Sequence, residues 1–155
     1  MAIMMIDRWL HIVAGVMWLG LLYYFNFVQV PAMAAATADK DGPGPAAIGK
    51  YVAPRALFWF RWAALVTWLT GAIFLATAPQ YSLHGAFTLG SGAHNASLTA
   101  IGFGAWLGTI MLFNVWGLIW PNQKKILGIV QASDAEKATA RRVAFLASRT
   151  NTLLS

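Results

Sequence analysis

The sequence of 155 residues contains no cysteine. This absence excludes disulfide bonds, thiolate metal sites, cysteine-ligated iron–sulfur clusters and covalently attached c-type haem. Charged residues are scarce, at 10% of the sequence, and only five are acidic. No recognisable phosphate-binding loop, paired carboxylate site or Ser–His–Asp arrangement is present. We therefore do not expect this chain to catalyse a reaction alone.

Apolar residues, by contrast, are abundant. Hydrophobic residues make up 59% of the sequence and aromatic residues 14%, which is too apolar for a soluble domain of this size. The formal net charge of +6 could suggest nucleic acid, but the basic residues cluster beside apolar segments rather than on a polar face. We expect membrane lipids as the surroundings and no nucleic-acid partner.

Three apolar segments are long enough to cross about 30 Å of hydrocarbon as helices, which requires about 20 residues each. They are residues 9–30, 56–78 and 98–120. Prolines are expected to bound these helices: Pro31, Pro54, Pro79 and Pro121. The sequence thus predicts an all-α integral membrane protein with three transmembrane helices in a single domain, residues 1–155.

The distribution of lysine and arginine predicts the orientation. Basic residues gather in the first loop and its margin and again after the third segment, whereas the opposite side has only Arg8. The N-terminus is therefore expected outside, and the tail of residues 121–155 is expected in the cytoplasm.

The tail carries a helix signal. Ser133 and Glu136 fit a capping box, and apolar or small residues then recur at helical spacing at Val143, Leu146 and Leu153, with Thr150 between them. This segment is either an amphipathic helix on the cytoplasmic membrane surface or the start of a fourth span. Because the sequence stops without a helix-ending signal, we expect the natural protein to continue.

An internal repeat links the first and third apolar segments. Trp18-Leu19-Gly20 is followed by Phe25-Asn26, and Trp106-Leu107-Gly108 is followed at the same spacing by Phe113-Asn114. Both copies run from outside to inside, as in a parallel duplication, although chance matching in tryptophan-rich helices is the alternative.

Gly104 and Gly108 form a small-xxx-small pair that lets another helix approach closely. We predict packing or interface roles for this pair and for the repeated residues Trp18, Trp106, Asn26 and Asn114.

Polar side chains within the apolar segments are candidates for a site, because they are costly in lipid. Asn26, Gln29, Arg61 and Asn114 all fall in the cytoplasmic third and could form one hydrogen-bonded cluster. Arg61 could then hold a carboxylate, a phosphate, a haem propionate or an anionic lipid. In the alternative interpretation, Arg61 extends to the headgroups and the amides join helices.

Histidines are expected on the outer face. His11 lies just inside the first segment, and His84 and His94 lie in the second loop. His11 and His94 are the candidate pair for a metal ion or for haem b, because neutral imidazole ligates haem iron, copper or zinc. The alternative is an interfacial hydrogen-bonding role, since no His-x-x-x-His or Glu-x-x-His motif accompanies them.

Several motifs resemble the membrane domain of bacterial cytochrome-linked urate oxidases. They are the stretch 11–29, Phe60-Arg61-Trp62, the stretch 68–71, the stretch 112–116 and the stretch 120–128. The resemblance implies a location in the bacterial cytoplasmic membrane and a fourth helix. Fuller members of the family carry a C-terminal cytochrome c that takes electrons from urate oxidation, but this sequence has no Cys-x-x-Cys-His motif.

Three functions are compatible with these observations. The chain could be a small accessory subunit of a larger respiratory or photosynthetic membrane complex, packed against other membrane-protein subunits. It could instead be a haem-binding redox protein, or the membrane part of a urate-type oxidase that passes electrons to a separate cytochrome. A transporter or channel for a small anion is the third interpretation, and it rests on Arg61 and the amides alone.

Overall fold

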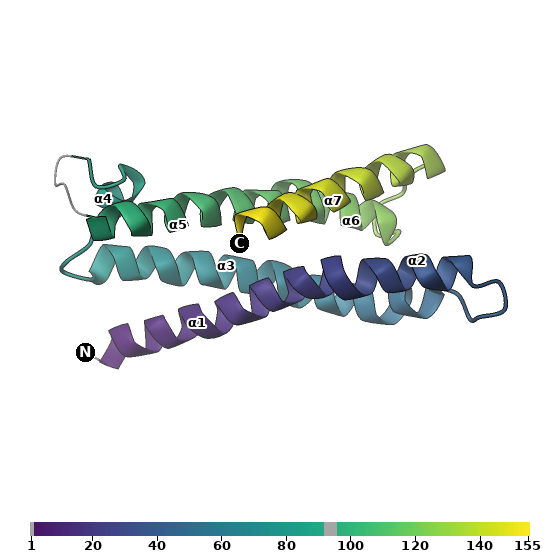
Figure 1. The fold of residues 1–155 in the computed structure, drawn as a ribbon, viewed down its shortest axis with the longest axis horizontal. Coiled ribbons are helices and arrows are strands. Elements are labelled where there is room, and N and C mark those ends of the chain that lie inside the picture. Colours follow the sequence, from purple (N-terminus) through teal and green to yellow (C-terminus); the bar gives the residue numbers. More distant parts are fainter. Residues whose placement is uncertain (1, 92–95) are drawn as a thin grey trace.

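The computed structural model describes residues 2–91 and 96–155, which form helices and turns without any strand. Three helices are long and apolar enough to cross a membrane: Ile3–Ala38, Ile48–Thr77 and Ala96–Ile126. The predicted all-α membrane fold with three spans is therefore confirmed. Figure 1 shows these helices lying along the long axis of the molecule, with a C-terminal helix beside them.

Each long helix joins regular α-helical segments to a wider π-helical turn. The elements in chain order are α1 (Ala2–Tyr23), η1 (Tyr24–Gln29), α2 (Val30–Ala38), η2 (Ile48–Val52), α3 (Ala53–Thr77), α4 (Leu83–Phe87), α5 (Ala96–Phe113), η3 (Asn114–Ile119), α6 (Trp120–Ile126) and α7 (Asp134–Leu154). We call the end of the bundle with the N-terminus and α4 the N-terminal end, and the end with α2 and α6 the basic end (Figure 1).

Two of the prolines do not end their helices, contrary to the prediction. Pro31 and Pro121 lie within continuous helices, each directly after a π-helical turn. The backbone N–H of Val30 donates to the Phe25 carbonyl, five residues back, and that of Trp120 donates to Val115. Because a proline ring collides with the carbonyl four residues earlier, a wider turn accommodates it. Pro54 follows η2 in the same way.

The connector between the first two spans is shorter than predicted, because α2 continues to Ala38 and η2 begins at Ile48. Only residues 39–45 lack helical structure. The long helices thus extend beyond the predicted spans at the basic end. Pro79, by contrast, lies just after the end of α3 at Thr77, as expected.

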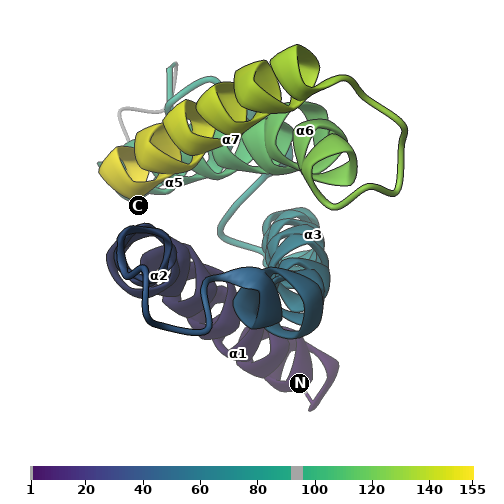
Figure 2. The ribbon, with the colours of Figure 1, turned by 90° about the vertical axis from the view of Figure 1, so that its right-hand side faces the viewer.

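Helix α7 runs back along the bundle. The predicted capping box is confirmed, since Ser133 Oγ accepts from the backbone N–H of Glu136 and the Glu136 carboxylate accepts from the backbone N–H of Ser133. Figures 1 and 2 show α7 beside α5 and α6 rather than across the end of the bundle. The structure thus shows a C-terminal helix packed along the third long helix, and the two predicted arrangements, a surface helix or the start of a fourth span, both stay predictions.

The face of α7 that is buried within the chain is not the apolar face that the sequence indicated. Its buried residues are Ala140, Ala144, Ala147 and Asn151, whereas Leu146 and Leu153 are 54% and 88% exposed. Helices in lipid gain little by burying large apolar side chains, so small residues pack against neighbouring helices and large ones face the lipid. The apolar stripe that marks the buried face of a soluble helix therefore does not predict which face of α7 packs against the other helices.

The closest packing lies toward the basic end. Trp18, Leu22 and Phe60 of the first two spans meet Met111, Val115 and Ile119 of the third, together with Ala147 of α7. In this region η1 and η3 both contact α7, which joins the two long helices that contain the repeat.

The repeat extends further along the chain. Ala56, Arg61 and Leu65 of α3 are followed, at the spacing that separates Trp18 from Trp106, by Ala144, Arg149 and Leu153 of α7. In both halves a long helix with a π-helical turn packs against the next long helix of its half. This arrangement favours duplication of a two-helix unit over chance matching.

Candidate functional site

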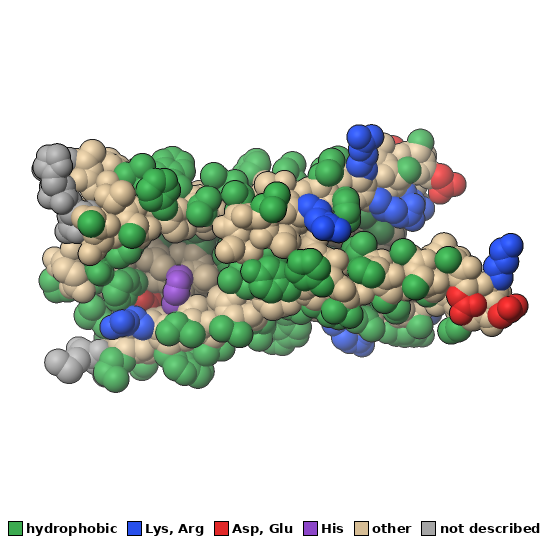
Figure 3. All heavy atoms as spheres, viewed as in Figure 1, with side chains coloured by type: hydrophobic (Ala, Val, Ile, Leu, Met, Phe, Trp, Pro, Cys, Tyr) green, Lys and Arg blue, Asp and Glu red, His purple; other side chains and the backbone are tan. Residues whose placement is uncertain are grey.

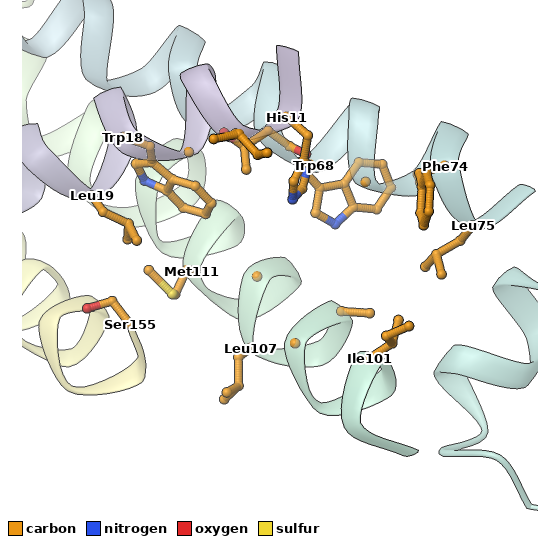
Figure 4. A pocket seen from close by; sticks show the side chains of 18 of the residues that line it. His11, Trp18, Leu19, Trp68, Phe74, Leu75, Ile101, Leu107, Met111 and Ser155 are labelled. Atoms are coloured by element: carbon orange, nitrogen blue, oxygen red, sulfur yellow. The ribbon is translucent and has the colours of Figure 1, made fainter. Parts of the chain in front are cut away.

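A cavity of about 780 Å³ opens between α1, α3 and α5 near the N-terminal end. The side chains around it are mostly apolar, and its polar members include Arg8, His11 and Thr67. Figure 3 shows a hollow in the surface at this end, and Figure 4 shows the side chains that project into it. The lining of apolar side chains with few polar groups is typical of a site for a small molecule or cofactor.

Glycines widen the cavity. Gly15, Gly71, Gly104 and Gly108 all line it. A Cβ placed on Gly104 or Gly108 would have no heavy atom within 4 Å. Within the described residues this pair therefore faces the cavity rather than a closely packed helix, and its predicted contact with a partner helix stays a prediction.

His11 projects from α1 into the cavity (Figure 4). Its Nδ1 lies 2.9 Å from the Thr67 carbonyl oxygen and 3.1 Å from Thr70 Oγ1. Since a carbonyl oxygen only accepts, this contact requires the proton on Nδ1. In the neutral imidazole the lone pair is then on Nε2, which forms no hydrogen bond within the described part of the chain.

Gly71 keeps this imidazole in place. A Cβ at Gly71 would lie 3.1 Å from His11 Cε1 and 3.4 Å from Nδ1. The Nδ1–Cε1 edge of the ring therefore packs on α3. A ring nitrogen bound to a backbone carbonyl, with the other nitrogen available, is the usual arrangement of a histidine that ligates a metal.

The other predicted ligands are not brought to His11 by the described structure. His94 lies outside the described residues, so its pairing with His11 stays a prediction. His84 is exposed on α4 and does not line the cavity. The described residues contain no group of three or more His, Cys, Asp or Glu side chains that could hold a metal ion.

Arg8 lies at the N-terminal rim of the same cavity. Its guanidinium carbon lies 5.6 Å from the centre of the Phe74 ring. It forms no ion pair within residues 2–91 and 96–155. Arg8 precedes His11 by three residues on α1, so both side chains lie on the same face of the helix.

Trp18 forms the deeper wall. Its side chain is 4% exposed, and its Nε1 has no hydrogen-bond partner among the described residues. The repeat partner Trp106 differs, because it is 46% exposed and donates to the Phe87 carbonyl. The two tryptophans thus occupy equivalent positions of the repeat but differ in burial and in hydrogen bonding.

The predicted cluster of four polar residues does not form. Asn26 donates to the Leu22 carbonyl and to Ser148 Oγ, at 2.9 and 2.8 Å. Asn114 donates to Asn151 Oδ1, and Asn151 donates back to the Met111 carbonyl. Both amides therefore bind side chains of α7, Ser148 and Asn151, rather than each other, Gln29 or Arg61.

Arg61 and Gln29 remain apart from this network. The Arg61 guanidinium carbon lies 3.8 Å from the centre of the Trp120 ring and 5.2 Å from that of Phe58. Gln29 is buried, and its Oε1 has no partner among the described residues. Arg61 does not line the cavity that contains His11, and its predicted role in cofactor binding stays a prediction.

Sequence reasoning missed the roles of Arg8, Thr67 and Gly71. Arg8 lies at helical spacing from His11 on α1, and Gly71 lies opposite His11 on α3. Nothing in the sequence alone says that α1 and α3 pack in this register.

No family model, curated protein or solved structure matches this chain.

Proposed function

We propose that this chain is a small membrane subunit that carries haem b and passes electrons to a separate cytochrome. The observation that carries the proposal is His11, whose Nδ1–H is held by the Thr67 carbonyl and whose side chain lines a cavity of about 780 Å³. An imidazole nitrogen in this state is a common axial ligand of a haem that is held without covalent bonds.

The cavity is large enough for the group. Its volume lies within the range of about 300–1,000 Å³ that ligand sites occupy. Gly104 and Gly108 leave space opposite α1 and α3, which suits a flat macrocycle. When bound, the haem supplies one-electron redox chemistry that no side chain of this sequence provides. The apolar side chains that line the cavity and His11 would hold the ring.

The resemblance to urate oxidase membrane domains supports the same proposal. In the fuller members of that family the membrane domain is joined to a cytochrome c, which this sequence lacks. We propose a separate cytochrome as the electron acceptor. We place the subunit in the bacterial cytoplasmic membrane with the N-terminal end outside, because the lysine and arginine residues gather at the basic end.

The first test is native mass spectrometry and absorption spectroscopy of the protein extracted from its own membrane in mild detergent. We expect a haem mass on the wild-type chain and its loss from His11→Ala. His84→Ala is the matched control and should retain the haem, because His84 lies outside the cavity. A wild-type chain without haem, or a His11→Ala variant that keeps it, would contradict the proposal.

A role of His94 as the second axial ligand can be tested on the same sample. If both histidines bind the iron, the haem is six-coordinate and low-spin, and His94→Ala converts it to a high-spin form that still binds through His11. An unchanged absorption spectrum in His94→Ala would show that His11 acts without His94.

The second candidate is an accessory subunit of a larger complex, which Gly104 and Gly108 favour because nothing covers them within the described residues. A partner helix would then lie on this pair. This function predicts a bare chain that copurifies with other subunits and is released when Gly108 is changed to Leu. The anion transporter is not retained, because the amides and Arg61 on which it rested do not come together.

A further inference from the structure

The rim of the cavity specifies the ligand further. We infer that the site selects a tetrapyrrole with free carboxylates and holds them at Arg8, with the apolar edge of the ring toward Trp18 and Met111. This inference rests on the proposed function, because it assumes that a haem-like ring binds at His11.

The first step is the relative position of Arg8 and His11. Both line the cavity, and three residues on one helix separate their Cα atoms by about 4.5 Å along the axis. Arg8 is the nearer of the two to the N-terminal end of the bundle. A ring held at His11 can therefore reach the Arg8 guanidinium with one edge.

The second step is the charge of the lining. Among the described residues, Arg8 is the only charged side chain that lines the cavity. It contacts the Phe74 ring and forms no ion pair with a carboxylate of these residues. A guanidinium binds carboxylates through paired hydrogen bonds. An imidazole that ligates iron does so through a nitrogen lone pair, so Arg8 is the side chain of this lining that can bind the carboxylates of a ring held at His11.

The third step is the opposite wall. The deep part of the cavity is formed by Trp18, Leu107 and Met111 (Figure 4), of which Trp18 and Met111 are each 4% exposed. Burying a carboxylate among such side chains would be costly without a cationic partner. A ring with one acidic and one apolar edge therefore has a single favourable orientation, with the acidic edge at the rim.

The carboxylate of a ligand and the phosphate of a lipid headgroup are both anions that Arg8 could bind. The experiment separates these sources by titrating the purified chain, in detergent free of anionic lipid, with haem b and with haem b dimethyl ester. Only the ligand's own carboxylates differ between the two titrations. The variants are Arg8→Gln, Arg8→Lys and the control Arg141→Gln, which removes an exposed arginine of α7.

We expect wild-type protein and Arg141→Gln to bind haem b about tenfold more tightly than the ester, as one charge-assisted interaction implies. Arg8→Gln should bind haem b and the ester equally, and Arg8→Lys should restore part of the preference. Equal affinities in the wild type, with binding still lost in His11→Ala, would overturn the Arg8 inference and leave the proposed function intact. Binding of neither compound would overturn both.

Discussion

The contact between His11 and Gly71 is the most demanding side-chain contact in the cavity. A Cβ at position 71 would lie 3.1 Å from His11 Cε1, so the imidazole would have to shift to make room for it. The hydrogen bond to Thr67 then determines which ring nitrogen carries the proton. A small residue on one helix thus decides the chemistry of a side chain on another.

Gly71→Ala should weaken haem binding by about tenfold, the lower end of the effect of changing groups that orient a metal ligand. The added methyl group would lie 3.1 Å from His11 Cε1 and push the ring from its position. Haem titration monitored by absorption measures the effect. Gly20→Ala is the control, because no atom lies within 4 Å of its Cβ position, and an equal loss in both variants would refute the contact as the cause.

Asn151→Ala should destabilise the protein by about 1 kcal/mol, a typical value for interhelical hydrogen bonds in membranes. The substitution removes the partner of Asn114 and the donor to the Met111 carbonyl. Unfolding in mixed micelles with increasing SDS gives the free energy. Thr150→Ala changes the exposed neighbouring residue and should have little effect. If both variants lost the same stability, the buried amide pair would not be the cause.

Among the elements, the π-helical turns and α7 depend on each other. The turns allow the long helices to continue past Pro31 and Pro121. They also contain Asn26 and Asn114, which both donate hydrogen bonds to side chains of α7. Helix α7 in turn presents Ser148 and Asn151 one turn apart on a face of small residues. The two long helices are therefore joined through a third element rather than directly through their amides.

Ser133→Ala should lower the stability of α7 by about 1 kcal/mol, because the N-cap hydroxyl accepts from the Glu136 backbone N–H. Hydrogen exchange of the first turn of α7 measures the change. Gln131→Ala, at an exposed position just before the cap, should leave exchange unaltered. Unchanged protection in Ser133→Ala would mean that packing alone holds this turn.

The same capping box should respond to pH. The hydrogen bonds from the backbone and side chain of Ser133 lower the pKa of Glu136 below its ordinary value of 4.5. A lowered folded-state pKa means that the contribution to stability is present above pH 4.5 and is lost as the pH falls through the folded pKa. Exchange protection of this turn, corrected for the intrinsic rate, should fall in that range. Glu136→Gln should remove the dependence, and a persistent dependence would point to another group.

At the scale of the whole molecule, charge and polarity are separated along the bundle axis. The cavity with His11 lies toward the N-terminal end, whereas lysines and arginines gather at the basic end (Figure 3). The closest packing lies between them. A ligand at His11 would therefore be reached from the N-terminal end or from the lipid, not through the basic end.

The proposed orientation predicts that Ser91→Cys reacts with a membrane-impermeant maleimide in intact cells, whereas Gln131→Cys reacts only after permeabilisation. Each new thiol is unique because the sequence contains no cysteine. Ser91 lies near the N-terminal end and Gln131 in the turn before α7, and both are exposed. The reverse labelling pattern would show that the N-terminus is cytoplasmic.

The sequence by itself determined the class of fold, the number of spans and the capping box of α7. These follow from length, hydropathy and local hydrogen bonding, which act within one segment at a time. It also indicated His11 as a candidate, since a histidine within an apolar helix is conspicuous. The resemblance to urate oxidase membrane domains rests on sequence motifs and stays a prediction.

Only the tertiary structure decided which residues meet. Whether Asn26 joins Asn114 or α7, and whether Gly71 lies against His11, depends on the register and rotation of helices far apart in the sequence. In lipid, that rotation is set by small residues and a few hydrogen bonds rather than by an apolar stripe. The same reason explains why the buried face of α7, and the passage of two helices through proline, could not be predicted from hydrophobic pattern.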